Sequence, residues 1–304
     1  MARKRTRHRA HHPVHWPGWL ALGLLRGASA LPIPWQIGLG RALGRLAYTF
    51  TPSRRHIARV NVGICFRDWS EQAREGLVRA HFEALGAGLF ETACGWWASD
   101  RRLARIGEVR GIEHLQRALE AGRGALLLSG HFTTLEISAR LLAMRHPISV
   151  MYRPHENPVI EHALHSNRSA HVLEVIARED GRGMLKALRA NHAVWYAPDQ
   201  SFKGRHSVLA PFCGEPAGTH TATARLAAMR QVPVLPFFGR RVPGPALRYE
   251  AEIGPALDGF PSGDLVADTT RVNAIIEAAA RRAPEQYFWL HRRFKKRPGL
   301  PDPY

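Results

Sequence analysis

A histidine and a glutamate stand where they could carry out acid–base chemistry. The stretch "LLLSGHFTTLEISARLL", residues 126–142, contains His131 and Glu136. The apolar run before the glycine predicts a short buried strand that ends in a turn. Thr133 and Thr134 then predict the start of a helix. His131 should therefore lie in a strand-to-helix turn, with Glu136 in the first turn of the helix.

Three uses of this pair are open at this point. His131 could be a turn histidine satisfied by a neighbour, with Glu136 favoured by the positive end of the helix dipole. The pair could bind a metal, but the sequence offers no matching third ligand. His131 could also be a general base, because the unperturbed pKa of histidine is about 6.5. Glu136 would then hold the imidazole tautomer, as the acid does in a serine hydrolase triad.

Polar residues also follow other predicted strands. Arg153 lies in "MYRPHENP", Asp199 in "APDQSFKG", and Arg168 in "HSNRSAH", which we expect to be a loop. Ligands of open α/β sheets bind at the carboxyl ends of the strands, so these residues together favour an active site. Arginine binds phosphate and carboxylate groups through paired hydrogen bonds. We therefore expect Arg153, Arg168 and Asp199 to bind the substrate.

The order of predicted elements favours an α/β fold. Strand-like and helix-like runs alternate from residue 105 onwards, and a long helix is expected over 267–282. Such alternation predicts a largely parallel sheet flanked by helices. We expect one α/β domain over residues 51–304, preceded by an N-terminal region over residues 1–50.

The N-terminal region combines a basic arm with an apolar segment. The arm reads "ARKRTRHR", and residues 16–35 read "WPGWLALGLLRGASALPIPW". An arginine and two prolines make a membrane-spanning helix a poor interpretation of this segment. The tryptophans at both ends and the basic flank are typical of a helix that lies at a lipid surface. A helix of the protein core is the alternative.

Charge and cysteine content limit the classes of partner and compartment. Lys and Arg outnumber Asp and Glu by 43 to 25, so the formal net charge is +18. That excess predicts an anionic partner, and nucleic acid is one candidate. The basic residues are not interleaved with aromatic residues on a nucleic-acid-binding module, which argues against that partner. Cys65, Cys94 and Cys213 are far apart in sequence, so we expect three unbridged cysteines and a reducing compartment.

Six ordered sequence blocks resemble one enzyme family. These blocks are "SGHFTTLE", "YRPHENPVI", "DGRGMLKAL", "AVWYAPDQ", "TATARLA" before "VPVLPFF", and "APEQYFWLHRRFKKRPG". In this order they resemble the late acyltransferases of bacterial lipid A biosynthesis, which are lauroyl, palmitoleoyl and myristoyl transferases. One block departs from the family pattern, because Ser201 stands where a second acidic residue usually follows Asp199.

The resemblance implies a reaction and its partners. An acyl chain would pass from acyl carrier protein to a hydroxyl of a Kdo-bearing, phosphorylated lipid A precursor, with lauroyl transfer favoured. His131 and Glu136 would be catalytic, and neither a metal nor a cofactor would be needed. The enzyme would act on the cytoplasmic face of the bacterial inner membrane, in contact with its lipids. The tryptophans of "GWW" (Trp96 and Trp97) or the N-terminal segment would line an acyl groove. Another lipid acceptor, such as a lysophospholipid, is the alternative.

Overall fold

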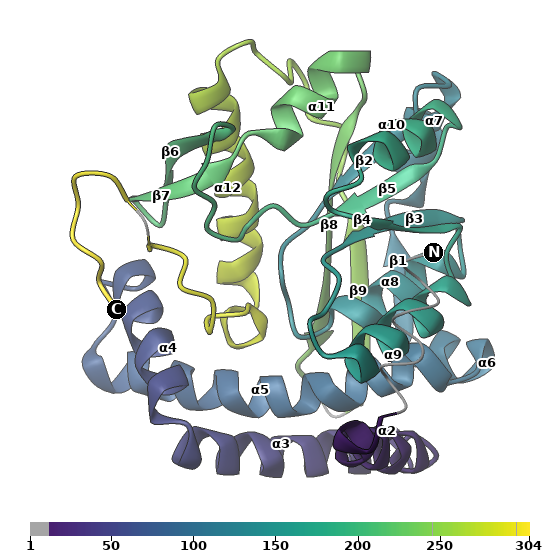
Figure 1. The fold of residues 1–304 in the computed structure, drawn as a ribbon, viewed down its shortest axis with the longest axis vertical. Coiled ribbons are helices and arrows are strands. Elements are labelled where there is room, and N and C mark those ends of the chain that lie inside the picture. The colour runs from purple at the N-terminus through teal and green to yellow at the C-terminus, as the bar shows by residue number, and fades with distance from the viewer. Residues whose placement is uncertain (1–11, 245, 296) are drawn as a thin grey trace.

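A seven-stranded sheet positions the predicted site residues (Figure 1). The computed structural model describes residues 12–244, 246–295 and 297–304. The strand order is β1-β9-β8-β2-β5-β3-β4, and every neighbouring pair is parallel except β8 and β9. The strands of this sheet are β1 (Gly107–Arg110), β2 (Ala125–Leu128), β3 (Ile148–Tyr152), β4 (Glu174–Ala177), β5 (Ala193–Tyr196), β8 (Val234–Val242) and β9 (Arg248–Ile253). A separate antiparallel pair consists of β6 (Ser207–Phe212) and β7 (Glu215–His220).

Helices cover both faces of the sheet, as expected for an α/β fold. Along β2, Leu126 and Leu128 pack into one apolar cluster, whereas Ala125 and Leu127 pack into another, because successive strand side chains point to opposite faces. Helices α7 and α8 contribute to the second cluster, and α10 and α12 to the first. The helices of this part are α6 (Asp100–Ala104), α7 (Ile112–Glu120), α8 (Leu135–Ala143), α9 (Pro158–Ser169), α10 (Gly181–Arg189), α11 (Ala222–Arg230), α12 (Leu265–Arg282) and the 3-10 turn η2 (Pro284–Gln286).

The predicted fold class is confirmed, and local sequence signals explain several element boundaries. Asn157 caps α9 through hydrogen bonds from the backbone of its first turn, with a proline at the first helical position. Asp264 caps α12 in the same way, so this helix begins two residues before the expected start. The prediction did not include β1 or the β6–β7 hairpin. Polar residues or prolines interrupt the apolar runs of these strands, unlike those of β2 and β5.

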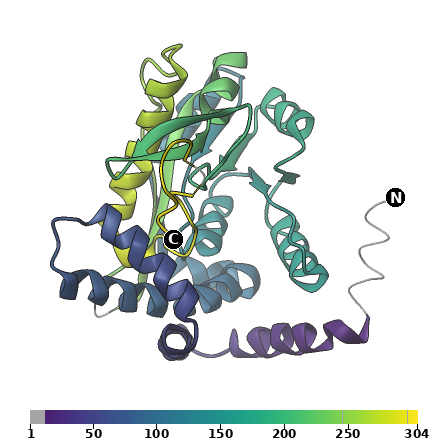
Figure 2. The same ribbon diagram turned by 60° about the vertical axis from the view of Figure 1, so that its left-hand side comes forward.

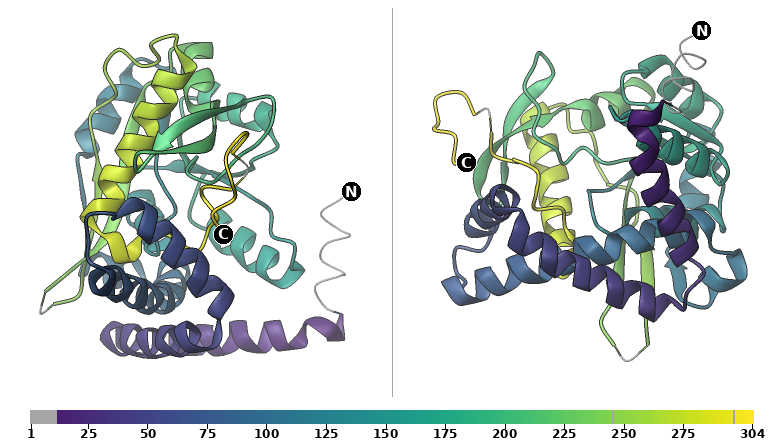
Figure 3. Two further views of the ribbon diagram at one scale, coloured as in Figure 1. Left: turned by 90° about the vertical axis from the view of Figure 1, so that its left-hand side faces the viewer. Right: turned by 60° about the horizontal axis from the view of Figure 1, so that its bottom comes forward.

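The N-terminal helices lie at one end of the molecule (Figures 2 and 3). The segment over 16–35 is not one helix, because α2 ends at Ala28 and α3 begins at Ile33, directly after Pro32. Helix α3 packs along α5, where Gly40 and Gly86 allow their backbones to approach closely. The boundary expected at residue 50 falls between two helices that both contact α5. These helices are η1 (Pro13–His15), α2 (Trp16–Ala28), α3 (Ile33–Phe50), α4 (Pro52–Cys65) and α5 (Glu71–Trp97).

Helices α2 and α3 expose a row of large apolar side chains. Trp16, Leu20 and Leu24 follow one another at intervals of one helical turn along α2, and none of the residues of this helix is buried. The row continues along α3 with Trp35, Leu39, Leu43, Leu46 and Phe50. Within the described ranges, no helix combines the length and the apolar character needed to cross a bilayer. The basic arm "ARKRTRHR" lies outside the described residues.

The prediction of three unbridged cysteines is wrong for two of them. Cys65, at the end of α4, and Cys213, at the tip of the β6–β7 hairpin, form a disulfide with their Cα atoms 4.8 Å apart. Cys94 is free and buried in α5. Folding brings together two residues separated by 148 positions, which cysteine spacing could not indicate. The reducing compartment inferred from unbridged cysteines thus loses its support.

Candidate active site

His131 pairs with Asp199 rather than with Glu136. Asp199 Oδ1 accepts a hydrogen bond from His131 Nδ1 at 2.6 Å, and Asp199 Oδ2 accepts one from the His131 backbone N–H at 2.9 Å. Strand register explains this pairing. Leu128 and Tyr196 are partners in the parallel strands β2 and β5, and His131 and Asp199 each follow three residues later. The carboxylate therefore comes from the neighbouring strand end.

This pairing favours the charged form of both side chains. Burial disfavours the imidazolium of His131, but the charge and the hydrogen bond of Asp199 outweigh burial and raise its pKa above 6.5. Burial likewise disfavours the Asp199 carboxylate, but the charge and the hydrogen bonds of His131 lower its pKa to about 2. Asp199 is 3% exposed, whereas the His131 side chain is 34% exposed. The histidine thus has one side fixed by a buried carboxylate and another open to the surroundings.

The second ring nitrogen of His131 contacts Gln200, beside which His131 lines a large cavity. Asp199 binds Nδ1–H, which leaves Nε2 as the acceptor nitrogen in the neutral ring. The Gln200 side-chain amide donates to this Nε2 at 3.3 Å. His131 and Gln200 both line a cavity of about 660 Å³, a volume typical of small-molecule sites. The arrangement places a proton acceptor at the wall of a ligand-sized space.

Glu136 belongs to a second buried pair. It lies in the first turn of α8 as predicted, where it forms a bidentate ion pair with Arg168, including Arg168 Nε to Glu136 Oε1 at 3.0 Å. Trp96 Nε1 donates to Glu136 Oε2 at 2.9 Å. The role predicted for Glu136, holding the His131 tautomer, is therefore wrong. The helix directs this carboxylate toward Arg168 and Trp96, and Asp199 already binds Nδ1 of the imidazole.

Arg168 is a helical residue rather than a loop residue. It lies in the last turn of α9, where helix formation continues through the polar "HSNRS" to Ser169. Its side chain is 16% exposed and lines the same cavity as His131. The carboxylate of Glu136 compensates much of its charge. Arg153 also lines the cavity and remains exposed, and it makes a long contact of 3.5 Å to Glu156.

The cavity wall combines apolar and cationic side chains. Trp195 lines it, whereas Trp96 is buried against Glu136 and neither Trp96 nor Trp97 is part of the lining. The prediction that the "GWW" tryptophans line the groove is therefore wrong for this cavity. Other apolar lining residues come from α8, β3, α9, α10 and α11 and are Leu135, Met151, Leu164, Met184, Leu226 and Met229.

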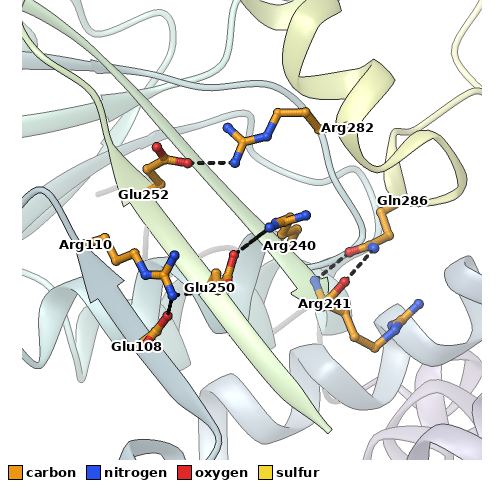
Figure 4. A network of polar contacts seen from close by, with 8 residues as sticks. All are labelled: Glu108, Arg110, Arg240, Arg241, Glu250, Glu252, Arg282 and Gln286. Atoms are coloured by element: carbon orange, nitrogen blue, oxygen red, sulfur yellow. Dashed lines mark hydrogen bonds and ion pairs between the residues drawn. The ribbon is translucent and has the colours of Figure 1, made fainter. Parts of the chain in front are cut away.

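The segment after α12 closes the site from behind. Phe288 N–H donates to the His131 carbonyl at 2.9 Å, and Thr133 N–H donates to the Gln286 carbonyl at 2.8 Å. The Gln286 side chain binds both the N–H and the carbonyl of Arg241 on β8, which anchors this segment to the sheet (Figure 4). Tyr287 forms a hydrogen bond to Asp199 that favours the carboxylate form. Burial and then the Asp199 charge raise the pKa of Tyr287 well above 10.

Sequence reasoning assigned no role to this segment. Gln286, Tyr287 and His291 occur in "APEQYFWLHRRF", a block that resembled the family, but their spacing gave no sign of their partners. A glutamine and a tyrosine inside an apolar run were the available signal, since buried polar groups require partners.

Ser201, which replaces the usual second acid, is held by the same segment. Its backbone N–H donates to Nε2 of His291 at 2.9 Å, and its hydroxyl donates to the carbonyl of Lys295 at 3.2 Å. Burial lowers the pKa of His291 to about 4, which keeps this ring neutral and able to accept a hydrogen bond.

Across the part of the chain that the structure describes, no three His, Cys, Asp or Glu side chains are grouped to hold a metal.

Comparison with known proteins places this site in a family. Residues 3–296 match the family model described as bacterial lipid A biosynthesis acyltransferase. The chain belongs to this family. It is 41% identical over 300 residues to the lipid A biosynthesis lauroyltransferase of Escherichia coli K12, with 96% of each chain covered. It is 35% identical over 291 residues to the palmitoleoyltransferase of that organism, covering 94% of each chain, and 25% identical over 299 residues to its myristoyltransferase, covering 96% and 91%.

This membership confirms the resemblance in the sequence and makes the chain an O-acyltransferase. Acyl transfer to a hydroxyl requires removal of the hydroxyl proton while its oxygen attacks an acyl carbon. In this family member, a histidine fixed by Asp199 lies at the wall of an apolar and cationic cavity. The site thus contains a candidate base and a space suited to an amphipathic substrate.

Proposed function

We propose that the protein transfers an acyl chain from acyl carrier protein to a hydroxyl of a Kdo-bearing, phosphorylated lipid A precursor. The preferred acyl chain is lauroyl. The observation that carries this proposal is the His131–Asp199 pair at the wall of the cavity, in a chain of the lipid A acyltransferase family. Similarity to the lauroyltransferase supports the chain length.

The proposed chemistry needs one proton acceptor and no covalent acyl-enzyme. Nε2 of His131 takes the proton of the acceptor hydroxyl as the hydroxyl oxygen attacks the thioester carbonyl carbon. The Asp199 carboxylate stabilises the resulting imidazolium. The tetrahedral intermediate then expels the thiolate, and the imidazolium returns the proton to sulfur. An ester and a thiol are formed, and His131 is neutral again.

The proposed acceptor lies where a membrane surface would meet the cavity. Helix α2 contacts α9 through the rings of Trp19 and His162, 5.5 Å apart, and α9 carries Arg168 at the cavity wall. The exposed apolar row of α2 and α3 would enter the lipid interface, and we take this interface to be the cytoplasmic face of the inner membrane. Arg153, an exposed residue of the cavity lining, would bind an acidic group of the acceptor. Arg168 would act mainly by holding Glu136.

A reaction with defined substrates tests the proposal. The full-length protein in detergent micelles is mixed with the tetra-acylated Kdo-bearing precursor as the acceptor. The donors are the lauroyl, palmitoleoyl and myristoyl thioesters of acyl carrier protein. Mass spectrometry of the lipid should show one added lauroyl group and much slower transfer of the other chains. A lysophospholipid acceptor is included in parallel. Faster acylation of the lysophospholipid than of the Kdo-bearing lipid would overturn the proposed acceptor.

A further inference from the structure

Helix α11, several residues of which line the cavity, lies at the opposite end of the molecule from α2 and α3 (Figure 1). The loop over 202–206, between β5 and β6, contributes exposed Lys203 and Arg205 to a basic patch. Helix α11 contributes exposed Arg225. We name the distal patch by its members, Phe202, Lys203, Arg205, Arg225 and Met229.

The two segments of the distal patch are joined by hydrogen bonds beside the cavity. Arg225 Nη1 donates to His206 Nδ1 at 2.5 Å, and the backbone N–H of Thr221 donates to the His206 carbonyl at 2.9 Å. These bonds join the loop to α11. Phe202, Arg225 and Met229 all line the cavity. Two large apolar side chains remain exposed there, Phe202 at 37% and Met229 at 61%.

The positive charges of the distal patch are not neutralised by carboxylates. Within the described ranges, Lys203, Arg205 and Arg225 form no ion pair. Glu215 is the only acidic residue between positions 201 and 231 in the sequence. It binds Arg67 and Arg297 instead. A concentrated positive surface of this kind attracts an acidic macromolecule and speeds its association.

We propose that the distal patch docks the acidic carrier protein that delivers the acyl thioester, an inference that rests on the proposed function. The lipid acceptor approaches from the end that carries α2 and α3, so a protein donor needs a separate approach to the same cavity. The patch provides that approach, with basic side chains for an acidic surface and Phe202 and Met229 for apolar contact. Anionic lipid is a poorer occupant, because α11 lies away from the apolar row.

Charge reversal at two residues outside the cavity lining tests the docking surface. We compare the full-length protein with Lys203→Glu/Arg205→Glu and with the control Arg101→Glu/Arg117→Glu. The control residues are exposed, lie on α6 and α7, and do not line the cavity. KM is measured for lauroyl acyl carrier protein and for lauroyl phosphopantetheine, which carries the same thioester without the protein. Binding of fluorescent carrier protein is followed by anisotropy.

The double variant at the patch should raise KM for the carrier protein on the order of tenfold or more. Its kcat and its KM for lauroyl phosphopantetheine should match those of the control. Added salt should weaken carrier binding to the original protein but have little further effect on the patch variant. An unchanged KM for the carrier protein, or an equal rise for both donors, would overturn the proposal.

Binding experiments separate failure of this inference from failure of the proposed function. If the original protein transfers no acyl chain, the proposed function fails, and the anisotropy experiment still decides whether carrier protein binds the patch. If the patch variant loses affinity for duplex DNA or for anionic vesicles while its carrier binding equals that of the control, the docking surface belongs to another class of partner. That result also overturns the inference.

Discussion

Two sets of charged side chains on the same sheet differ mainly in their exposure to water. At the carboxyl ends of β2 and β5, Asp199 and Glu136 are buried, and each binds a cationic partner. On β9, Glu252 binds Arg282 of α12 with both side chains about half exposed (Figure 4). Exposed pairs of this kind contribute about 0–1 kcal/mol to stability. Removing one partner of a buried pair costs about 3–5 kcal/mol. Burial, rather than the number of charges, therefore distinguishes the pairs at these strand ends from the Glu252–Arg282 pair.

The largest expected effect is on catalysis at the buried region. His131→Ala removes the proposed base and should lower kcat by roughly 100-fold or more. Because the variant also leaves the buried Asp199 carboxylate without its partner, the free energy of unfolding should fall as well, by up to about 3–5 kcal/mol. Activity is measured by lauroyl transfer to the lipid acceptor, with folding followed by circular dichroism. A folded variant with nearly unchanged kcat would remove His131 from the mechanism.

Removal of one partner from the second buried pair should mainly reduce stability. Arg168→Ala leaves the Glu136 carboxylate buried without its cation, so the free energy of unfolding should fall by about 3–5 kcal/mol. The double variant Arg168→Met/Glu136→Leu should recover much of this loss, because apolar residues of similar volume require no charge compensation. Urea denaturation measures the free energy of unfolding of the single and the double variant. Equal stability of the single variant and the original protein would show that the pair is not a buried unit.

Gln286 anchors the segment behind His131 to β8, and its loss should have an intermediate effect. Gln286→Ala removes both side-chain hydrogen bonds to the Arg241 backbone and leaves buried groups without partners. Each unsatisfied group costs about 1–3 kcal/mol, so we expect reduced stability together with lower kcat as the segment behind His131 loosens. Gln286→Glu retains the length of the side chain but loses its amide donor. A melting curve and a kcat that match the original protein would contradict this anchoring role.

The smallest effect should come from the exposed region. Glu252→Gln should change the free energy of unfolding by less than about 1 kcal/mol, because water screens the pair with Arg282. It should leave kcat unchanged, which makes this variant the matched control for the buried carboxylates. A larger loss of stability in urea denaturation would show that the exposed ion pairs also support the sheet.

The sequence predicted the fold class and the location of His131 because both depend on local patterns. An apolar run that ends in a glycine identifies β2, and the helix signal after it positions Glu136 in α8. The partner of His131 depends on strand order, and β5 comes beside β2 only after two intervening strands, β3 and β4. Sequence proximity thus favoured Glu136 over Asp199. The same limit applies to Cys65 and Cys213, whose contact is long-range.

The dependence of kcat/KM on pH tests most directly whether Asp199 controls the base. The original protein should gain activity as pH rises through the pKa of His131, which lies above 6.5 because Asp199 stabilises the charged ring. Asp199→Asn removes that stabilisation, so the rise should move to lower pH while the maximal rate falls. Glu136→Gln, a matched carboxylate-to-amide change, should move the rise much less. A large shift in Glu136→Gln with none in Asp199→Asn would contradict the account.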